Sequence, residues 1–295
     1  MKFNNGDLKD INGSPILLDA LVPQDQDVLT ILERYRKELP SDNDIIGHSM
    51  VPLSGANECK LRECNLGNLV LDAMVYARVK VLANNTDFKY YTDASIAFLN
   101  AGGIRSSIDK KPDGSITKSD IKLVLPFKGK FVLIEVSGHI IRKVLDHSAS
   151  EYGANNAAGG ILQMAGLSVT YNFNKTDPEE KVRAIYVVCA NCDVPVYEPF
   201  YLARMYKIIV PIYLYKGGGG YKFSENDTDA LPPILFEFND LDVDYVLDYL
   251  RDHKIVYPGL EDRINFEFEE ETSGGLMFLA CPMFVLSSLF SKYTF

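Results

Sequence analysis

The chain has 295 residues, with 47% hydrophobic and 24% charged side chains, a balance typical of globular proteins. Its length suits one large domain or two small ones. Lys and Arg number 30 and Asp and Glu number 40, so the formal net charge is −10 at pH 7. This composition excludes nucleic acid polymers as the main partner, because no basic run is present to neutralise phosphates. A small anion in a local pocket is compatible with an acidic surface.

The first 22 residues are read as a strand and turns, with Pro15–Leu18 apolar. A helix is predicted over residues 23–40, because its apolar positions, Val28, Leu29, Leu32, Tyr35 and Leu39, recur at helical spacing. A second helix is predicted from Asn65, as the N-cap, to about Val81. Lys60 and Arg62 lie just before it, and cations beside a helix N-terminus form either an anion site or a solvated basic loop.

The segment Leu99–Asp109, with the sequence LNAGGIRSSID, follows a short apolar run that reads as a buried strand. Gly102 and Gly103 allow the backbone to turn where side chains would block it. This arrangement would present Asn100 and Arg105 to a polar or anionic ligand. An ordinary turn with a surface arginine is the alternative.

The rest of the chain alternates between strands and helices. Strands are predicted at 122–127, 131–136, 159–171, 182–189 and 206–215, and helices after Gly138 and over 241–250. The strand at 206–215 ends in a run of four glycines, 217–220. No repeat or low-complexity linker interrupts 41–268, so we predict one domain of the α/β or α+β class.

Five cysteines bear on the cellular compartment. The close pairs Cys59/Cys64 and Cys189/Cys192 are either two disulfides or four zinc ligands, and Cys281 stands alone. Disulfides are favoured, because a second Cys-x₂-Cys and histidines at finger-like spacing are both missing from the sequence. An oxidising compartment follows. Four glycosylation sequons support it, at Asn12, Asn84, Asn174 and Asn226.

The two ends of the chain give conflicting indications. The N-terminus has no apolar core of signal-peptide length. Residues 272–295 form an apolar tail that begins with small residues, which is typical of a GPI-attachment signal with Ser273 as the attachment residue, although the polar spacer is nearly absent. A transmembrane anchor is the alternative, but Pro282 and Lys292 make the span short and imperfect. A secretory tail without a secretory leader predicts that an N-terminal part is missing.

Sequence motifs of catalysis are missing from the chain. The four histidines form no His-Glu-x-x-His or Asp-x-His element, the serines no Gly-x-Ser-x-Gly turn, and the glycine run no phosphate loop. We therefore predict no catalytic residue, metal ligand or cofactor in this chain. What remains is a set of recognition groups, Lys60, Asn100, Arg105, Phe127, Tyr213 and Tyr215. Two aromatic residues at strand ends would stack on a flat ring, or else simply pack in the core.

Several of these segments occur together in one order: LRECNLGNLVLDAM, LNAGGIRSSID, IKLVLPF, IEVSGHIIRKVLDHS, GGILQMAGLSVTYN and YKIIVP followed by GGGGY. They closely resemble the C-terminal domain of the ecto-5′-nucleotidase and secreted apyrase family. The resemblance implies layered sheets flanked by helices in a substrate-binding domain at 41–268. It also implies that 1–22 is the remnant of a metallophosphoesterase domain, which carries the family's zinc, and that 23–40 is a bridging helix.

The resemblance also implies roles for single residues. Asn100 and Arg105 match base- and phosphate-contacting positions, and Phe127 and Tyr213 match the aromatic pair that holds the base. Gly219 stands where the family carries an Asp that accepts hydrogen bonds from the ribose hydroxyls, and Lys60 stands where vertebrate members carry an Arg near phosphate. Losing the carboxylate should weaken binding by about 1.5–3 kcal/mol.

Two hypotheses follow from the resemblance. The chain is either the nucleotide-binding half of a hydrolase that dephosphorylates extracellular nucleotides, or a non-catalytic relative that binds nucleotides or serves as a surface interaction domain. AMP or adenosine is the expected ligand, a homodimer is possible, and the cell surface or the extracellular space is the expected location, through a lipid anchor. The chain alone is expected to lack hydrolase activity.

Overall fold

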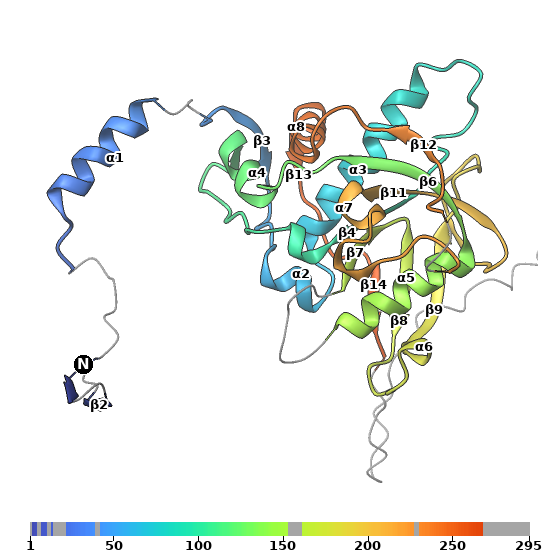
Figure 1. Cartoon of the computed structure of the whole chain (residues 1–295). Helices are drawn as coiled ribbons and strands as arrows, with labels where there is room; N and C mark the ends of the chain where they lie inside the picture. Colours follow the sequence, from blue (N-terminus) through green and yellow to red (C-terminus); the bar gives the residue numbers. More distant parts are fainter. Residues whose placement is uncertain are drawn as a thin grey trace, which may run out of the picture.

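The computed structural model describes residues 2–4, 7–10, 13, 22–38, 42–152, 161–226 and 230–267 (Figure 1). Its α-helices are α1 Gln26–Glu38, α2 Asn57–Leu61, α3 Asn65–Ala83, α4 Lys118–Val124, α5 Gly138–Glu151, α6 Pro178–Lys181, α7 Ile212–Tyr215 and α8 Asp242–His253, with 3₁₀ turns η1 Ala101–Gly103 and η2 Gly218–Gly220. The strands are β1 Lys2–Asn4, β2 Asp7–Asp10, β3 Ile45–Ser49, β4 Ile96–Asn100, β5 Ser115–Thr117, β6 Phe131–Ser137, β7 Leu162–Ala165, β8 Leu167–Tyr171, β9 Val182–Val188, β10 Tyr197–Pro199, β11 Met205–Pro211, β12 Ile234–Glu237, β13 Ile255–Val256 and β14 Ile264–Phe266.

A mixed five-stranded sheet in the order β12-β6-β11-β4-β7 forms the centre of the fold. Strand β11 runs parallel to β4 and antiparallel to β6, while β7 and β12 close the two edges in antiparallel fashion. Two smaller sheets flank it, β10-β9-β8-β14 and β13-β3-β5. Alternating strands and helices around a mixed sheet confirm the predicted α/β (α+β) class.

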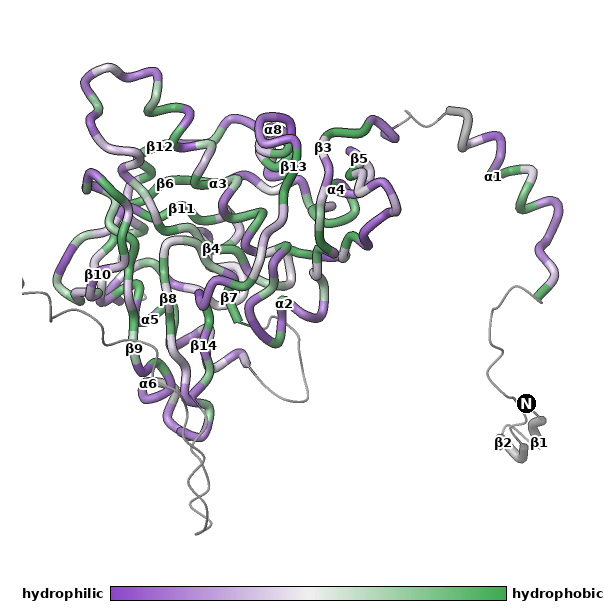
Figure 2. Tube along the Cα trace, turned by 180° about the vertical axis from the view of Figure 1, so that it is seen from behind, coloured by the Kyte–Doolittle hydropathy of each residue, from purple (hydrophilic) through white to green (hydrophobic). Residues whose placement is uncertain are grey.

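Both faces of the central sheet are buried. Along β11, Ile209 packs into one hydrophobic core, whereas its neighbours Ile208 and Val210 pack into the other. The first core lies between the sheet and α3, α4 and α8, and the second lies between the sheet and α5, β8 and β9. A strand that is covered on both faces has a continuous apolar sequence, and for this reason the strands could be predicted from the sequence. Figure 2 shows the hydrophobic colour concentrated inside the body and the hydrophilic colour on the outer loops.

A partly buried ion-pair cluster joins α3 to the central sheet. Asp93, in the loop before β4, accepts hydrogen bonds from Arg78 Nε at 2.8 Å and from Lys207 Nζ at 3.0 Å. Burial opposes ionisation of Asp93, but the hydrogen bonds and charges of its two cationic partners outweigh it and lower the pKa of this carboxyl below its ordinary value.

Helix α1 lies apart from the body in Figure 1. Its apolar residues lie on one side at the spacing predicted from the sequence, yet Val28, Leu32 and Tyr35 are each about half exposed. No described residue covers this face. The helix therefore exists where the sequence predicts it, while its bridging role stays a prediction.

Two predicted strands are partly helical in the structure. The first half of the segment predicted as a strand at 122–127 belongs to α4, because Thr117 and Asp120 form a capping box that starts a helix at Lys118, and the second half is the turn after that helix. The segment predicted as a strand at 206–215 changes at Pro211 from β11 to the short helix α7. A proline that ends the strand ladder explains this change of structure.

The N-cap of α3 also differs from the prediction. Cys64 holds that position, with its sulfur accepting from Gly67 N, and Asn65 is the first helical residue. Within the ranges that the structure describes, no helix is both long and apolar enough to cross a bilayer. The apolar tail with Ser273, the sequon Asn12 and the apolar run Pro15–Leu18 lie outside those ranges.

Candidate functional site

A cavity of about 670 Å³ opens at one end of the strands of the central sheet. The parallel strands β4 and β11 both end there, since Ile208 and Ile209 pair with Ile96 and Ala97. Strand β6 starts there, because it runs antiparallel to β11. The segments that leave β4, leave β11 and enter β6 therefore meet at one place. Ligand sites in mixed sheets commonly lie at such strand ends.

The resemblance gives roles to six residues, and five of them line this cavity: Asn100, Arg105, Phe127, Tyr213 and Gly219. Asn100 is the last residue of β4, and Tyr213 lies on α7, directly after β11. Phe127 lies between α4 and β6. Lys60 is on α2 and is not among the residues lining the cavity. Tyr215 is directed elsewhere, because its hydroxyl donates to Pro232 O at 2.8 Å.

Arg105 and Phe127 form one wall of the cavity. The guanidinium carbon of Arg105 lies 5.6 Å from the centre of the Phe127 ring, at cation–π distance. The backbone N–H of Arg105 donates to Val124 O at 2.9 Å, and one guanidinium nitrogen donates to Gly102 O at 3.2 Å. Phe127 is 66% exposed, so its ring is not a core residue. A ring with a free face and a partly free guanidinium are suited to a flat, anionic ligand.

Asn100 places an amide beside this wall. Its side chain lies over Gly103, with Oδ1 3.7 Å from the position that a Cβ there would take. No described residue makes a hydrogen bond to this amide. The amide group offers both a donor and an acceptor to a ligand.

Tyr213 and the glycine turn form a second wall. Tyr213 is 58% exposed, and its ring packs directly on the backbone of Gly218. A Cβ at Gly218 would lie 2.5 Å from both the ring and the carbonyl oxygen of Tyr213. Residue 218 must therefore be glycine for the ring to keep this position.

Gly219 has the left-handed conformation, with φ at +66°. Its carbonyl oxygen accepts a hydrogen bond from His147 Nε2 at 2.8 Å, and the imidazole packs edge-on against the ring of Tyr221 at 4.6 Å. His147 thus fixes the turn that carries Gly219. The sequence does not indicate this role, because it depends on α5 packing beside the glycine run.

Two carboxylates that sequence reasoning missed line the cavity as well, Glu151 and Asp242. Asp242 is buried, and its oxygens accept from Gly129 N at 3.0 Å and from Val243 N at 2.7 Å. Burial raises the pKa of Asp242, although these two hydrogen bonds oppose the change. Glu151 is the exposed last residue of α5. Neither residue belongs to a motif, so the sequence offered no signal for them.

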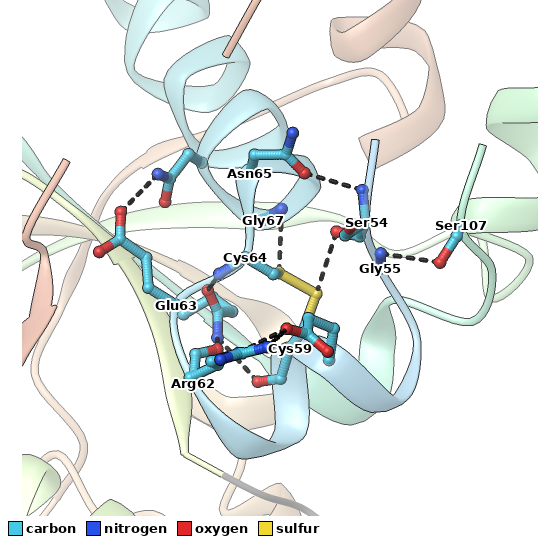
Figure 3. The surroundings of a disulfide bond; sticks show 12 residues. Ser54, Gly55, Cys59, Arg62, Glu63, Cys64, Asn65, Gly67 and Ser107 are labelled. Carbon is cyan, nitrogen blue, oxygen red and sulfur yellow. Dashed lines mark hydrogen bonds and ion pairs between the residues drawn. A yellow bond between two sulfur atoms is a disulfide. The ribbon is translucent and has the colours of Figure 1, made fainter. Parts of the chain in front are cut away.

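The disulfide Cys59–Cys64 supports the loop that carries Arg105 (Figure 3). Gln163 on β7 fixes the disulfide-bonded turn to the sheet by donating to Cys59 O at 2.7 Å and accepting from Cys64 N at 3.1 Å. On the other side of the turn, Gly55 N donates to Ser107 Oγ at 2.9 Å. The disulfide thus closes a turn that Gln163 fixes to the sheet, and the segment just before this turn contacts the segment after Arg105.

The structure also contains the second predicted disulfide, Cys189–Cys192. Of the sequons, Asn84, Asn174 and Asn226 are exposed, and whether they carry glycans stays a prediction. Across the described ranges, no three His, Cys, Asp or Glu side chains come together as a metal site would require.

The fold and the cavity define a class of protein: a layered α/β domain with a cavity at the ends of its central strands. The chain matches the family model described as 5′-nucleotidase, C-terminal domain, over residues 45–225. The chain therefore belongs to the 5′-nucleotidase C-terminal domain family.

Individual relatives agree with this assignment. The chain is 33% identical to a mouse 5′-nucleotidase over 277 residues and 33% identical to a human 5′-nucleotidase over 279 residues. These matches cover 93% of this chain but 45% and 46% of the relatives, so the chain spans about half the length of the relatives it matches. The crystal structure of a 5′-nucleotidase precursor from Thermus thermophilus aligns with a TM-score of 0.65 at 27% identity, covering 83% of this chain and 43% of the other.

Proposed function

We propose that this domain is the nucleotide-binding half of a 5′-nucleotidase-like hydrolase that acts on extracellular nucleotides. In this proposal the base of AMP or adenosine stacks between Phe127 and Tyr213. Asn100 hydrogen-bonds the base, and Arg105 attracts the phosphate. The single observation that carries the proposal is that two exposed aromatic rings, a guanidinium and an amide with no hydrogen-bond partner among the described residues line one cavity.

Three of the side chains in the cavity wall match the parts of a nucleotide. Phe127 and Tyr213 are more than half exposed in a cavity wall, where burial against a flat ring would remove apolar surface from water. Stacking of a base on an aromatic side chain contributes about 1–3 kcal/mol. A guanidinium is suited to phosphate, because its planar donors match the phosphate oxygens. A nucleoside monophosphate combines a base and a phosphate in one molecule.

The zinc chemistry of such a hydrolase would belong to another domain. The described residues do not fit a metal, since no group of three suitable ligands is present among them. This chain's own contribution would be to bind and orient the nucleotide. We further propose an extracellular or cell-surface location, which the two disulfides support. A lipid anchor at Ser273, a homodimer and the bridging role of α1 are proposed from the resemblance.

A non-catalytic nucleotide-binding protein is the second candidate function. The observation that favours it is Gly219, which lines the cavity without a side chain. Such a protein would use the same aromatic pair and the same cavity, so binding alone does not separate the two functions. Hydrolysis by a protein that joins this domain to a metal-binding half would favour the first function.

Calorimetry with adenosine and AMP on the 295-residue chain tests the proposal. We expect weak binding of both, with a lower Kd for AMP because of Arg105. Phe127→Ala and Tyr213→Ala should each raise Kd by about five- to 100-fold, as expected for a lost stacking contact. Tyr257→Ala is the matched control, since Tyr257 is 75% exposed and does not line the cavity. Equal effects of all three substitutions would contradict the proposal.

A further inference from the structure

Glu151 shares one face of α5 with the residue that holds the glycine turn. It lies four residues after His147, and residues four apart on a helix are neighbours on its surface. His147 Nε2 donates to Gly219 O at 2.8 Å. Glu151 is thereby directed to the same side as Gly219, and both residues line the cavity.

The carboxylate of Glu151 makes no hydrogen bond or ion pair with any residue that the structure describes, whereas Asp242 is engaged by two backbone N–H groups. Glu151 also lies close enough to Tyr221 to affect its hydroxyl. Burial is the main cause that raises the pKa of Tyr221, and the charge of Glu151 adds to it. This carboxylate therefore lies at the Tyr221 end of the cavity.

Glu151 does not serve the stability of its own helix. An acidic side chain in the last turn of a helix is unfavourable, because the C-terminal end carries the negative end of the helix dipole. The last turn of α5 itself contains no Lys or Arg, and the nearby cation Lys181 donates to the backbone Ala149 O at 3.4 Å and makes no ion pair with Glu151. A carboxylate that lines the cavity wall without a partner among the described residues is better explained by the ligand than by the fold.

We propose that Glu151 is the residue that makes the cavity selective for ligands with vicinal hydroxyl groups, such as a ribose. Its two oxygens accept hydrogen bonds from two neighbouring hydroxyls, which charge assistance strengthens. Gly219 has no side chain to do this, and its carbonyl oxygen already accepts from His147. Arg105 and Glu151 then give the cavity a positive and a negative group, one for phosphate and one for the sugar. This inference rests on the proposed nucleotide-binding function.

A comparison of adenosine with 2′,3′-dideoxyadenosine isolates this contact, because the two ligands share a base and differ in both hydroxyls. We expect the unaltered 295-residue chain to bind adenosine about 10- to 100-fold more tightly than the dideoxy ligand in calorimetry. Glu151→Gln should reduce this preference for adenosine to severalfold or less, chiefly by weakening the binding of adenosine. Glu237→Gln is the matched control, because Glu237 is exposed on β12 and outside the cavity. The midpoint of thermal unfolding of Glu151→Gln should be unchanged or slightly raised.

The outcomes separate the two levels of the proposal. An undiminished ratio in Glu151→Gln would overturn the role of Glu151, as would equal binding of the two ligands by the unaltered chain, while the nucleotide-binding function would stand. If the unaltered chain bound neither ligand at millimolar concentration, the proposed function would fail, and the inference with it. A lowered unfolding midpoint in Glu151→Gln would show that the residue serves the fold.

Discussion

The substitution Gly219→Asp tests the consequence of a missing side chain at the cavity wall. Gly219 has φ at +66°, where any residue with a Cβ is strained by about 1–2 kcal/mol. Asp tolerates this conformation better than most residues. A Cβ at this position would meet Tyr221 Cδ2 at 3.3 Å and Tyr213 Oη at 4.0 Å, so the space is tight but sufficient.

Gly219→Ala is the matched control, because it adds the same Cβ and a similar strain without a carboxylate. Both variants should lower the free energy of unfolding by about 1 kcal/mol. In calorimetry with adenosine, Gly219→Asp should bind more tightly than both Gly219→Ala and the unaltered chain. Its advantage over Gly219→Ala should be about tenfold, near the lower end of what a charge-assisted hydrogen bond contributes at an open site.

The introduced carboxylate should interact with the carboxylate already in this cavity. If the new side chain at position 219 and Glu151 both accept from the ribose, their like charges repel, and part of the gain from the substitution is lost. The tenfold gain should therefore grow when Gly219→Asp is combined with Glu151→Gln. The reasoning would be refuted if Gly219→Asp bound adenosine no more tightly than Gly219→Ala in either background.

Three further predictions follow from the structure. Gly218→Ala should weaken adenosine binding at least severalfold in calorimetry, because its Cβ would displace the ring of Tyr213; unchanged affinity would contradict this packing. Asp93→Asn should lower the free energy of unfolding by about 2 kcal/mol at pH 7, against less than about 1 kcal/mol for Asp42→Asn at the surface. The pKa of Asp93 in the folded state lies below 3.8, so the ionised carboxylate stabilises the fold above that pH, and this stabilisation is lost as the pH falls through the folded pKa. Denaturant titrations from pH 7 to pH 3 should therefore show the difference in unfolding free energy between Asp93→Asn and the unaltered chain shrink. Finally, the 295-residue chain with added Zn²⁺ should release no phosphate from AMP, because its sequence lacks the motifs of a metal pair; turnover would contradict this.

The fold was largely predictable because the inner strands of its central sheet are buried on both faces. Segments such as β4 and β6 are continuous apolar runs. In α3 and α8 the apolar residues recur at helical spacing and do not alternate as in a strand. The error at 122–127 had a physical cause that was present in the sequence. Thr117 and Asp120 are spaced as a capping box, and this local signal outweighs the strand-like apolar residues that follow.

Only part of the site could be predicted from the sequence. Residues that lie in one short segment could be predicted, whereas residues brought together from distant segments could not. Asn100 and Arg105 lie in one short turn, so a local motif revealed them. Glu151 enters the cavity because α5 packs near a turn about 70 residues later, and the sequence contains no pattern for that contact. Lys60 was given a role by the resemblance, and α2 places it outside the residues that line the cavity, so its role in binding stays a prediction. A side chain's place in a cavity is set by which elements pack together, and for Glu151 that placement is also what suggests a role.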